Sequence, residues 1–464
     1  MTGRNSKFAT WLLAYILAQA AGLAVVAQAA EIQMQVQAVP GAQASPSPTG
    51  KLLTIEDAVR IGLENHPRIK SAGERISSQQ AVLGQQIAAY YPTISLSNQY
   101  RSAQATTIGD ARAIETYSSQ FSFNQTLYNF GKREGNVQAA RDTLGAIQQD
   151  YATTTQDIVL AIKTAYYNYL TAQAIVNVRK ETVRNRELLV RQARGFFEVG
   201  TRAKIDVARA EANLYTAQAD LIAAENNVKI AWVTLRNAMG SPRLPEQPVA
   251  EDSPEVELSM NLAGARNIAY DTRSELKSSE ALRRAADQVI ATARRGHLPD
   301  VIFDASWGRG HSSGDVDQRN TFPLRANWSV GLSLNIPIFD GFRTTQRVEE
   351  TLHNYYDLKA REEELRQRIA LDVEQFYLRV VETQERIRAN ESAAKASKEN
   401  LDLAQGRYQV GVGSIIEVTD AETLYTEAQT TYVRSVYEYK IADALLARAM
   451  GDTRVAVLKQ NSIK

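Results

Sequence analysis

The chain has 464 residues, no cysteine, and 53 basic against 52 acidic side chains, which gives a formal net charge of +1. The missing cysteine excludes disulfide bonds and an N-terminal lipoprotein anchor. The near-neutral charge argues against nucleic acid as a partner, and the length is sufficient for two or three domains.

The first 29 residues are predicted to be a secretory signal peptide rather than part of the fold. Arg4 and Lys7 precede an apolar stretch over 8–26, and a small-x-small cleavage site follows at 27–29. A membrane anchor is the alternative, because the apolar stretch approaches spanning length. Residues 30–50, rich in Gln, Ala, Pro and Ser, are expected to be a disordered linker.

The second half of the chain repeats the first half at an offset of 211 residues. Between 195–240 and 406–451, 16 of 46 positions are identical without a gap. We therefore expect two tandem units, one over 51–240 and one over 259–451, with a linker over 241–258 and a C-terminal tail over 452–464. Internal pseudo-symmetry of this kind favours a ring, a barrel or a tube over a cleft enzyme.

Four segments in which apolar and polar residues alternate are predicted to be strands. Each has the length of a tilted strand that crosses a bilayer, and the alternation fits lipid on one face and water on the other. Trp307 and Trp328 near the loop ends are consistent with an aromatic girdle. Two hairpins packed on a soluble core are the alternative. The segments are 93–101, 117–128, 300–308 and 327–338.

Four strands are too few to close a membrane barrel, which needs about eight or more. The open edges would have to be removed by association of several copies. Two copies would give a barrel whose interior is nearly filled by side chains, whereas three copies could leave a lumen. We therefore expect a trimer with a twelve-stranded barrel.

The rest of each unit is predicted to be helical. Long helices are expected over 129–197 and 340–408, and returning helices over 205–239 and 416–450. A shorter helix precedes each strand pair and ends before a proline, at Pro92 or Pro299, because the residue before proline disfavours the helical conformation. The fold class is therefore mainly α with a membrane β-barrel portion, built from two tandem repeats of helix, hairpin, long helix and helix.

The second long helix carries apolar residues with an 11-residue period. This period indicates lateral packing that is nearly straight or slightly right-handed. A helix of this kind is not stable alone and needs neighbouring helices. The apolar positions are Leu365, Ile369, Phe376, Val380 and Ile387.

Several segments, duplicated and in order, resemble the TolC-like family of outer-membrane channel proteins. The resemblance covers about residues 51–451 and implies a homotrimer whose twelve-stranded barrel sits in the outer membrane. It also implies an α-helical tunnel that crosses the periplasm and meets a periplasmic adaptor (membrane fusion) protein and an inner-membrane pump. The segments are LTIEDAVRIGLENHPRIK, YYPTISL, HLPDVIF, TLYNFGKR, PIFDGFR, FEVGTRAKIDV and YQVGVGSIIEVTDAE.

The resemblance implies a passive trimeric exit duct of a tripartite efflux or type I secretion system. The pump supplies the energy in such a system, so no cofactor, metal or catalytic residue is expected. A periplasmic or cell-surface coiled-coil structural or adaptor protein is the alternative. The four histidines lack partners at ligand or triad spacing and no phosphate-binding loop is present, so the sequence does not support an enzyme.

The resemblance also places a gate at the helix turns. Glu417 and Asp420 match acidic residues that ring the periplasmic constriction in this family. At positions i and i+3 they share one helix face, and in a trimer they would form a ring that attracts cations. Compensation of the helix dipole by acids in a first turn is the alternative.

In the family, a tyrosine and an arginine on the second turn hold an aspartate on the first turn. Tyr408 and Asp206 match the tyrosine and the aspartate. The arginine position falls on Gly413, whereas Arg202 occupies the equivalent place in the first repeat. Whether Arg202 takes part in the closed state is left open by the sequence.

The two repeats differ where the gate is expected. The first repeat has Asp206 and Arg209 at the positions that Glu417 and Asp420 occupy in the second. Gly200 and Gly411, by contrast, stand at equivalent positions and are predicted to be turn residues.

Overall fold

A computed structural model describes most of the chain between residues 52 and 451. The predicted signal peptide, the linker after it and the C-terminal tail lie outside the described residues, as do residues 252–258 of the linker between the repeats. No described helix is both long enough and apolar enough to cross a membrane. The described ranges are 52–107, 110–251, 260–312 and 325–451.

Two short helices precede the strands in the first repeat, where one was expected. They are α2 (Ile55–Asn65) and α3 (Pro67–Ala88). The break falls at His66, because Pro67 cannot donate a backbone hydrogen bond but fits the first position of a new helix. The His66 Nδ1 caps α3 by accepting from the Arg68 amide at 3.1 Å.

The second repeat has the same break without a proline. Here α6 (Leu262–Thr272) is followed by α7 (Ser274–Arg294) and a 3-10 turn over Arg295–His297. Arg273 between the helices has an extended backbone, and its guanidinium pairs with Glu275 at 3.3 Å and Asp372 at 3.1 Å.

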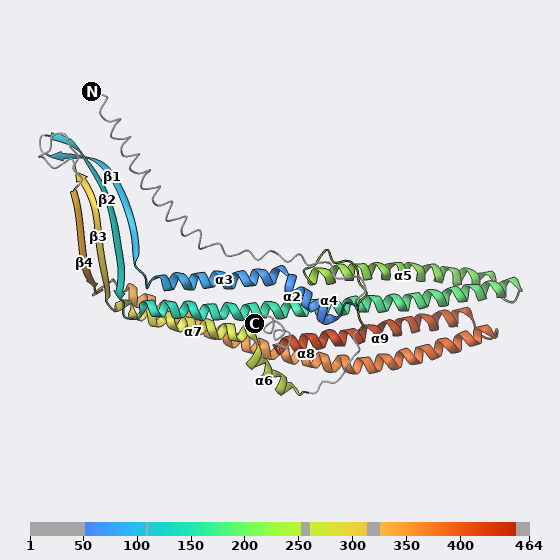
Figure 1. The fold of residues 1–464 in the computed structure, drawn as a ribbon. Helices are drawn as coiled ribbons and strands as arrows, with labels where there is room; N and C mark the ends of the chain where they lie inside the picture. Colours follow the sequence, from blue (N-terminus) through green and yellow to red (C-terminus); the bar gives the residue numbers. More distant parts are fainter. Residues whose placement is uncertain (1–51, 108–109, 252–259, 313–324, 452–464) are drawn as a thin grey trace, which may run out of the picture. The chain divides into compact units, whose positions relative to one another are not determined.

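Four antiparallel strands form one sheet in the order β1-β2-β3-β4 (Figure 1). The ladder continues beyond the expected ends of the first three strands, because backbone pairing persists where the apolar alternation stops. The last strand ends three residues earlier than expected, since Pro337 has no N–H to donate. The strands are β1 (Thr93–Thr107), β2 (Asp110–Tyr128), β3 (Asp300–Ser312) and β4 (Arg325–Asn335).

The register arranges apolar side chains in rows across the sheet. Leu96 lies opposite Phe121, and Phe121 lies opposite Trp307. Trp307 in turn lies opposite Trp328. Directly opposed residues point to the same face, so one face is apolar and the other is polar. A row of serines crosses the other face: Ser95, Ser122, Ser306 and Ser329.

The apolar face is exposed in the single chain, and the sheet has two open edges. Trp328 is 75% exposed and Val330 is 62% exposed. Within the described residues, β1 pairs only with β2, and β4 pairs only with β3. An exposed apolar patch of this kind marks a surface that lipid or another protein covers, and an unpaired edge is open to a further strand.

The long helices begin slightly later than expected. Phe130 and Phe342 adopt left-handed backbones, with φ of 54° and 65°, and the helices start only after them. Each long helix has 67 residues, which corresponds to about 100 Å at 1.5 Å per residue. The helices are α4 (Lys132–Glu198), α5 (Lys204–Ala238), α8 (Arg343–Gln409) and α9 (Ile415–Ala449).

The long helices pack laterally. Helix α4 contacts α3, α5, α7 and α9, while α8 contacts α7 and α9. On α8 the predicted 11-residue stripe is the buried one, because Ile369 and Val380 are fully buried while Leu365, Phe376 and Ile387 are partly buried against them. Burial of this stripe holds α8 against its neighbours, which leaves the two helix turns at the ends of packed helical hairpins.

Candidate functional site at the two helix turns

Each helical hairpin ends in a tight turn built around a glycine. Gly200 and Gly411 have φ of 74° and 84°, a left-handed conformation that glycine adopts without strain. After Gly200, the Thr201 amide donates to the Phe196 carbonyl at 2.9 Å, and the second turn repeats this bond from Val412. These are Schellman caps, so both glycines lie in the turns that end the long helices.

Arg202 of the first turn donates directly to the second turn. Its Nη2 donates to the Gly411 carbonyl at 2.9 Å and to the Gly413 carbonyl at 2.7 Å. A side chain at Gly413 would place its Cβ 3.0 Å from Arg407 and from the Tyr408 amide. A side chain at position 413 would therefore crowd the backbone of the second turn, and the arginine between the turns comes from the first repeat instead.

Tyr408 lies at the centre of the contact between the turns. Its ring is fully buried, packs edge-on against Phe196 at 5.6 Å, and lies 5.6 Å from the Arg202 guanidinium carbon. Burial raises the pKa of the Tyr408 phenol, and the nearby Asp206 carboxylate adds to the rise while Arg202 opposes it. The hydroxyl has no hydrogen-bond partner within the described residues. Tyr408 and Asp206 are thus neighbours without the hydrogen bond that the resemblance implies.

The two acidic residues of the expected cation ring are exposed on the first turns of α9. Ser414 caps this helix by accepting from the Glu417 amide at 3.2 Å. The Glu417 carboxylate pairs with Arg407 at 3.3 Å. No ion pair is found for Asp420 in the part of the chain that the structure describes. The two carboxylates share one helix face but differ in their degree of neutralisation.

A buried polar layer lies between α4 and α9, and the sequence did not predict it. Arg186 Nε lies 2.6 Å from Glu422 Oε2, and one turn away the Thr182 and Thr426 hydroxyls lie 3.1 Å apart. Burial raises the pKa of Glu422 to about 7, against the attraction of Arg186, while Glu181 adds to the rise. Charged residues on a helix normally indicate a solvated face, so the sequence carries no local signal for this layer.

An apolar cluster surrounds the turns and the polar layer. Its members come from both hairpins, so the cluster holds the two turns together and buries area that separation would expose. The fully or largely buried members are Leu189, Val190, Ala193, Ala210, Leu401, Ala404, Tyr408, Ile415, Val418 and Ala421.

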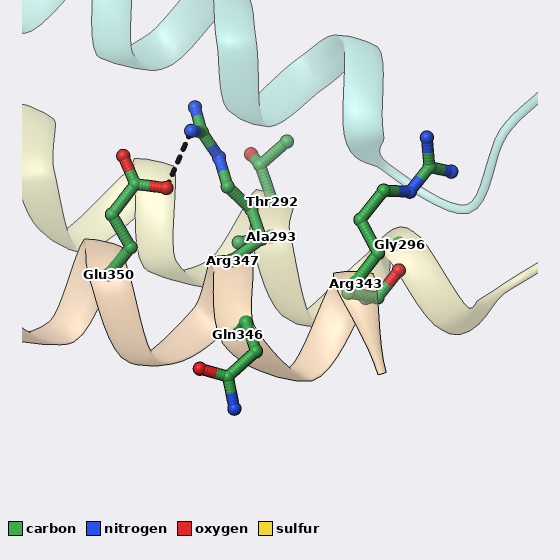
Figure 2. A pocket seen from close by; sticks show the side chains of 8 residues that line it. Thr292, Ala293, Gly296, Arg343, Gln346, Arg347 and Glu350 are labelled. Carbon is green, nitrogen blue, oxygen red and sulfur yellow. Dashed lines mark hydrogen bonds and ion pairs between the residues drawn. The ribbon is translucent and has the colours of Figure 1, made fainter. Parts of the chain in front are cut away.

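A separate hollow of about 610 Å³ lies where the end of α7 meets the start of α8 (Figure 2). Thr292, Gly296 and Arg343 are among its lining residues, and Arg347 pairs there with Glu350 at 2.7 Å. None of the residues singled out in the sequence lines it. The helix turns are therefore the candidate site, because they bring Arg202, Tyr408 and the acidic pair together.

The comparison with known families decides the identity. Residues 59–241 and 266–452 match the family model described as outer membrane efflux protein, one match for each repeat. The chain belongs to the outer membrane efflux protein family. The expected TolC-like resemblance, the mainly helical two-repeat fold and an outer-membrane location are confirmed.

Two curated relatives each align with this chain over most of its length and over most of their own length. Outer membrane protein TolC of Vibrio cholerae is 26% identical over 398 residues, which are 84% of this chain and 88% of the relative. Protein CyaE of Bordetella pertussis is 26% identical over 431 residues, 88% of this chain and 86% of the relative.

A solved structure shares the fold. The crystal structure of the outer membrane protein VceC from Vibrio cholerae superimposes with a TM-score of 0.71, at 18% identity, over 86% of this chain and 96% of that chain. The family is one of channels and transport proteins, which agrees with a site made of helix turns rather than a cleft.

Proposed function

We propose that three copies of this outer membrane efflux protein form a passive exit duct through the outer membrane and across the periplasm. The observation that carries the proposal is the four-stranded sheet with an exposed apolar face, a polar opposite face and two open edges. Lipid against the apolar face and a neighbouring copy against each edge would satisfy all of these surfaces.

The assembly follows from closing the open edges. In a ring of three chains, β4 of one chain pairs with β1 of the next, which gives a twelve-stranded barrel. The polar face with the row of serines then faces the lumen, and the apolar face with Trp307 and Trp328 faces lipid. The alternative of a coiled-coil structural protein leaves the exposed face with Trp328 and Val330 without a cover.

The helices continue the duct toward the inner membrane in this proposal. A periplasmic adaptor and an inner-membrane pump would dock at the helical end and supply both substrate and energy. The description of the family names efflux, and the proposed role covers an exit duct for either efflux or type I secretion. Nothing in a passive duct requires a catalytic group.

We further propose that the helix turns are the periplasmic entrance. Three copies of Glu417 and Asp420 would ring the axis, and their charge would attract and hold cations. Arg202 would keep the entrance closed by holding the carbonyls of the second turn, with Tyr408 and Asp206 packed beside it. Support comes from the bonds at 2.9 and 2.7 Å between the turns.

Two measurements on the purified protein test the proposed function. A detergent-extracted sample should migrate as a trimer that dissociates on heating, and it should conduct ions in a planar lipid bilayer. Deletion of the gene for this protein from its host should abolish export by the partner pump. A water-soluble monomer without conductance would contradict the proposal.

A further inference from the structure

The polar layer between α4 and α9 is built on a charged pair that the proposed function does not use. The side chains of Arg186 and Glu422 are 7% and 2% exposed, and their Nε and Oε2 atoms lie 2.6 Å apart. Arg186 Nη2 also donates to the Thr419 carbonyl at 3.4 Å and the Thr423 hydroxyl at 3.3 Å. This contact, called the α4–α9 charge contact below, joins the first hairpin to the second.

Two polar atoms of the charge contact are left without a hydrogen bond. Arg186 Nη1 and Glu422 Oε1 each lack a hydrogen-bond partner within the described residues. A buried pair of this kind adds little net stability, since desolvation offsets the attraction. Its strength lies in discrimination, because a shift of α9 along α4 would set a charge against the apolar cluster. The contact therefore specifies how α9 aligns on α4.

Comparison of the repeats shows that the duplicated fold does not require the contact. Glu211 occupies the position equivalent to Glu422, but the position equivalent to Arg186 is Ser397. Glu211 instead pairs with Arg194 of its own hairpin at 2.6 Å, with 34% and 58% of the two side chains exposed. The buried pair is thus a feature of the interface that joins the two repeats.

We propose that Arg186 and Glu422 are gate-positioning residues, whose opposite charges align α9 on α4 and so set the closed position of the second helix turn against the first. This inference rests on the proposed function. Glu422 lies two residues beyond Asp420 on the same helix, so any displacement of α9 carries Glu417 and Asp420 with it. Separation of the hairpins would bring both charges into water.

Charge reversal in planar bilayers tests the proposal. Arg186→Glu and Glu422→Arg each place like charges in the buried layer, and each should raise conductance by shifting the ratio of open to closed channels on the order of tenfold. The double swap restores opposite charges and should return conductance close to that of the unmodified chain. Arg194→Glu and Glu211→Arg are matched controls at the partly exposed pair and should change conductance little.

The outcomes separate this proposal from the proposed function. An unmodified chain that neither assembles as a trimer nor conducts would refute the duct itself. A conducting unmodified chain with single variants of unchanged conductance would refute only the positioning role. A double swap that conducts like the single variants, while all three variants migrate as heat-dissociable trimers, would likewise refute only the positioning role.

A second variant covers the case in which the reversals fail to assemble. Thr182 and Thr426 have hydroxyls 3.1 Å apart across the same layer, and the chain has no cysteine of its own. Oxidation of a Thr182→Cys, Thr426→Cys channel should lower conductance several-fold, and reduction should restore it. A bridge that forms without lowering conductance would show that α4 and α9 need not separate, which overturns the proposal.

Discussion

At the scale of single residues, Arg202 donates to the second turn from the first, whereas the resemblance implies an arginine on the second turn. The side chain reaches the Gly411 and Gly413 carbonyls from the first repeat. The direction of the contact is reversed, but a guanidinium still joins the turns. Charge-assisted bonds to backbone carbonyls depend on the position of the donor rather than on which helix carries it.

Replacement of Arg202 by Met should therefore open the entrance. Loss of the two hydrogen bonds from this one guanidinium should cost the closed state about 1 to 3 kcal/mol per chain, which would appear as a higher conductance in planar bilayers. Arg209→Met removes the same charge from an exposed site on α5 and serves as the control. Equal conductance of the two variants would rule out a role for Arg202 in closure.

The unequal neutralisation of the acidic pair leads to a second prediction. Asp420→Asn should weaken block by Mg²⁺ more than Glu417→Gln, because Arg407 already compensates Glu417 at 3.3 Å. Titration of Mg²⁺ against single-channel current measures the difference directly. If Glu417→Gln has the larger effect, Arg407 does not shield that carboxylate in the assembled channel.

At the scale of elements, regular patterns were readable from the sequence and pairings across the chain were not. Alternation located the four strands and the glycines located both turns, because each depends on neighbouring residues. The break before α3 was missed although Pro67 marks it in the sequence. The break before α7 was missed because it has no proline, and the partners of Arg273 there include the distant Asp372. Arg186 and Glu422 were missed for the same reason: partners far apart in sequence leave no periodic signal.

The interface between α4 and α9 should respond to pH through Glu422. The pKa of Glu422 is raised from its ordinary value of 4.5 to about 7 in the closed interface. Burial raises it by more than the attraction of Arg186 lowers it, and repulsion from Glu181 raises it further. The stabilisation is complete below pH 4.5 and is lost as pH rises through about 7. The full difference is on the order of 3 kcal/mol. On α8, Lys398 lowers and Asp402 raises the pKa of Tyr425, and neither contributes to the shift of the Glu422 pKa.

Conductance should accordingly rise between pH 4 and pH 8, a range that spans both pKa values, as the closed interface loses this stabilisation. A Glu422→Gln channel should lose the dependence, whereas a Glu211→Gln channel should retain it. Persistence of the full pH response in Glu422→Gln would assign it to other groups.

At the scale of the whole molecule, the two sheet faces should tolerate charge differently. Val330→Arg places a cation on the proposed lipid face and should cost about 2 to 4 kcal/mol per chain near the bilayer midplane. Ser329→Arg, one residue away, points to the polar face and should be tolerated. The yield of heat-dissociable trimers from outer membranes compares the two variants. Similar yields would argue against lipid on the apolar face.

Glu422 pairs with an arginine of the other repeat, whereas Glu211 pairs with an arginine of its own hairpin, and this difference has a consequence for how a ring can operate. A closed ring of six identical units has six identical junctions, which must all loosen together or not at all. Two units fused in one chain make alternate junctions chemically distinct, three within chains and three between them. In the proposed trimer, two units in one chain therefore allow threefold movement in a nearly sixfold tube, and substitutions can adjust one class of junction while the other stays unchanged.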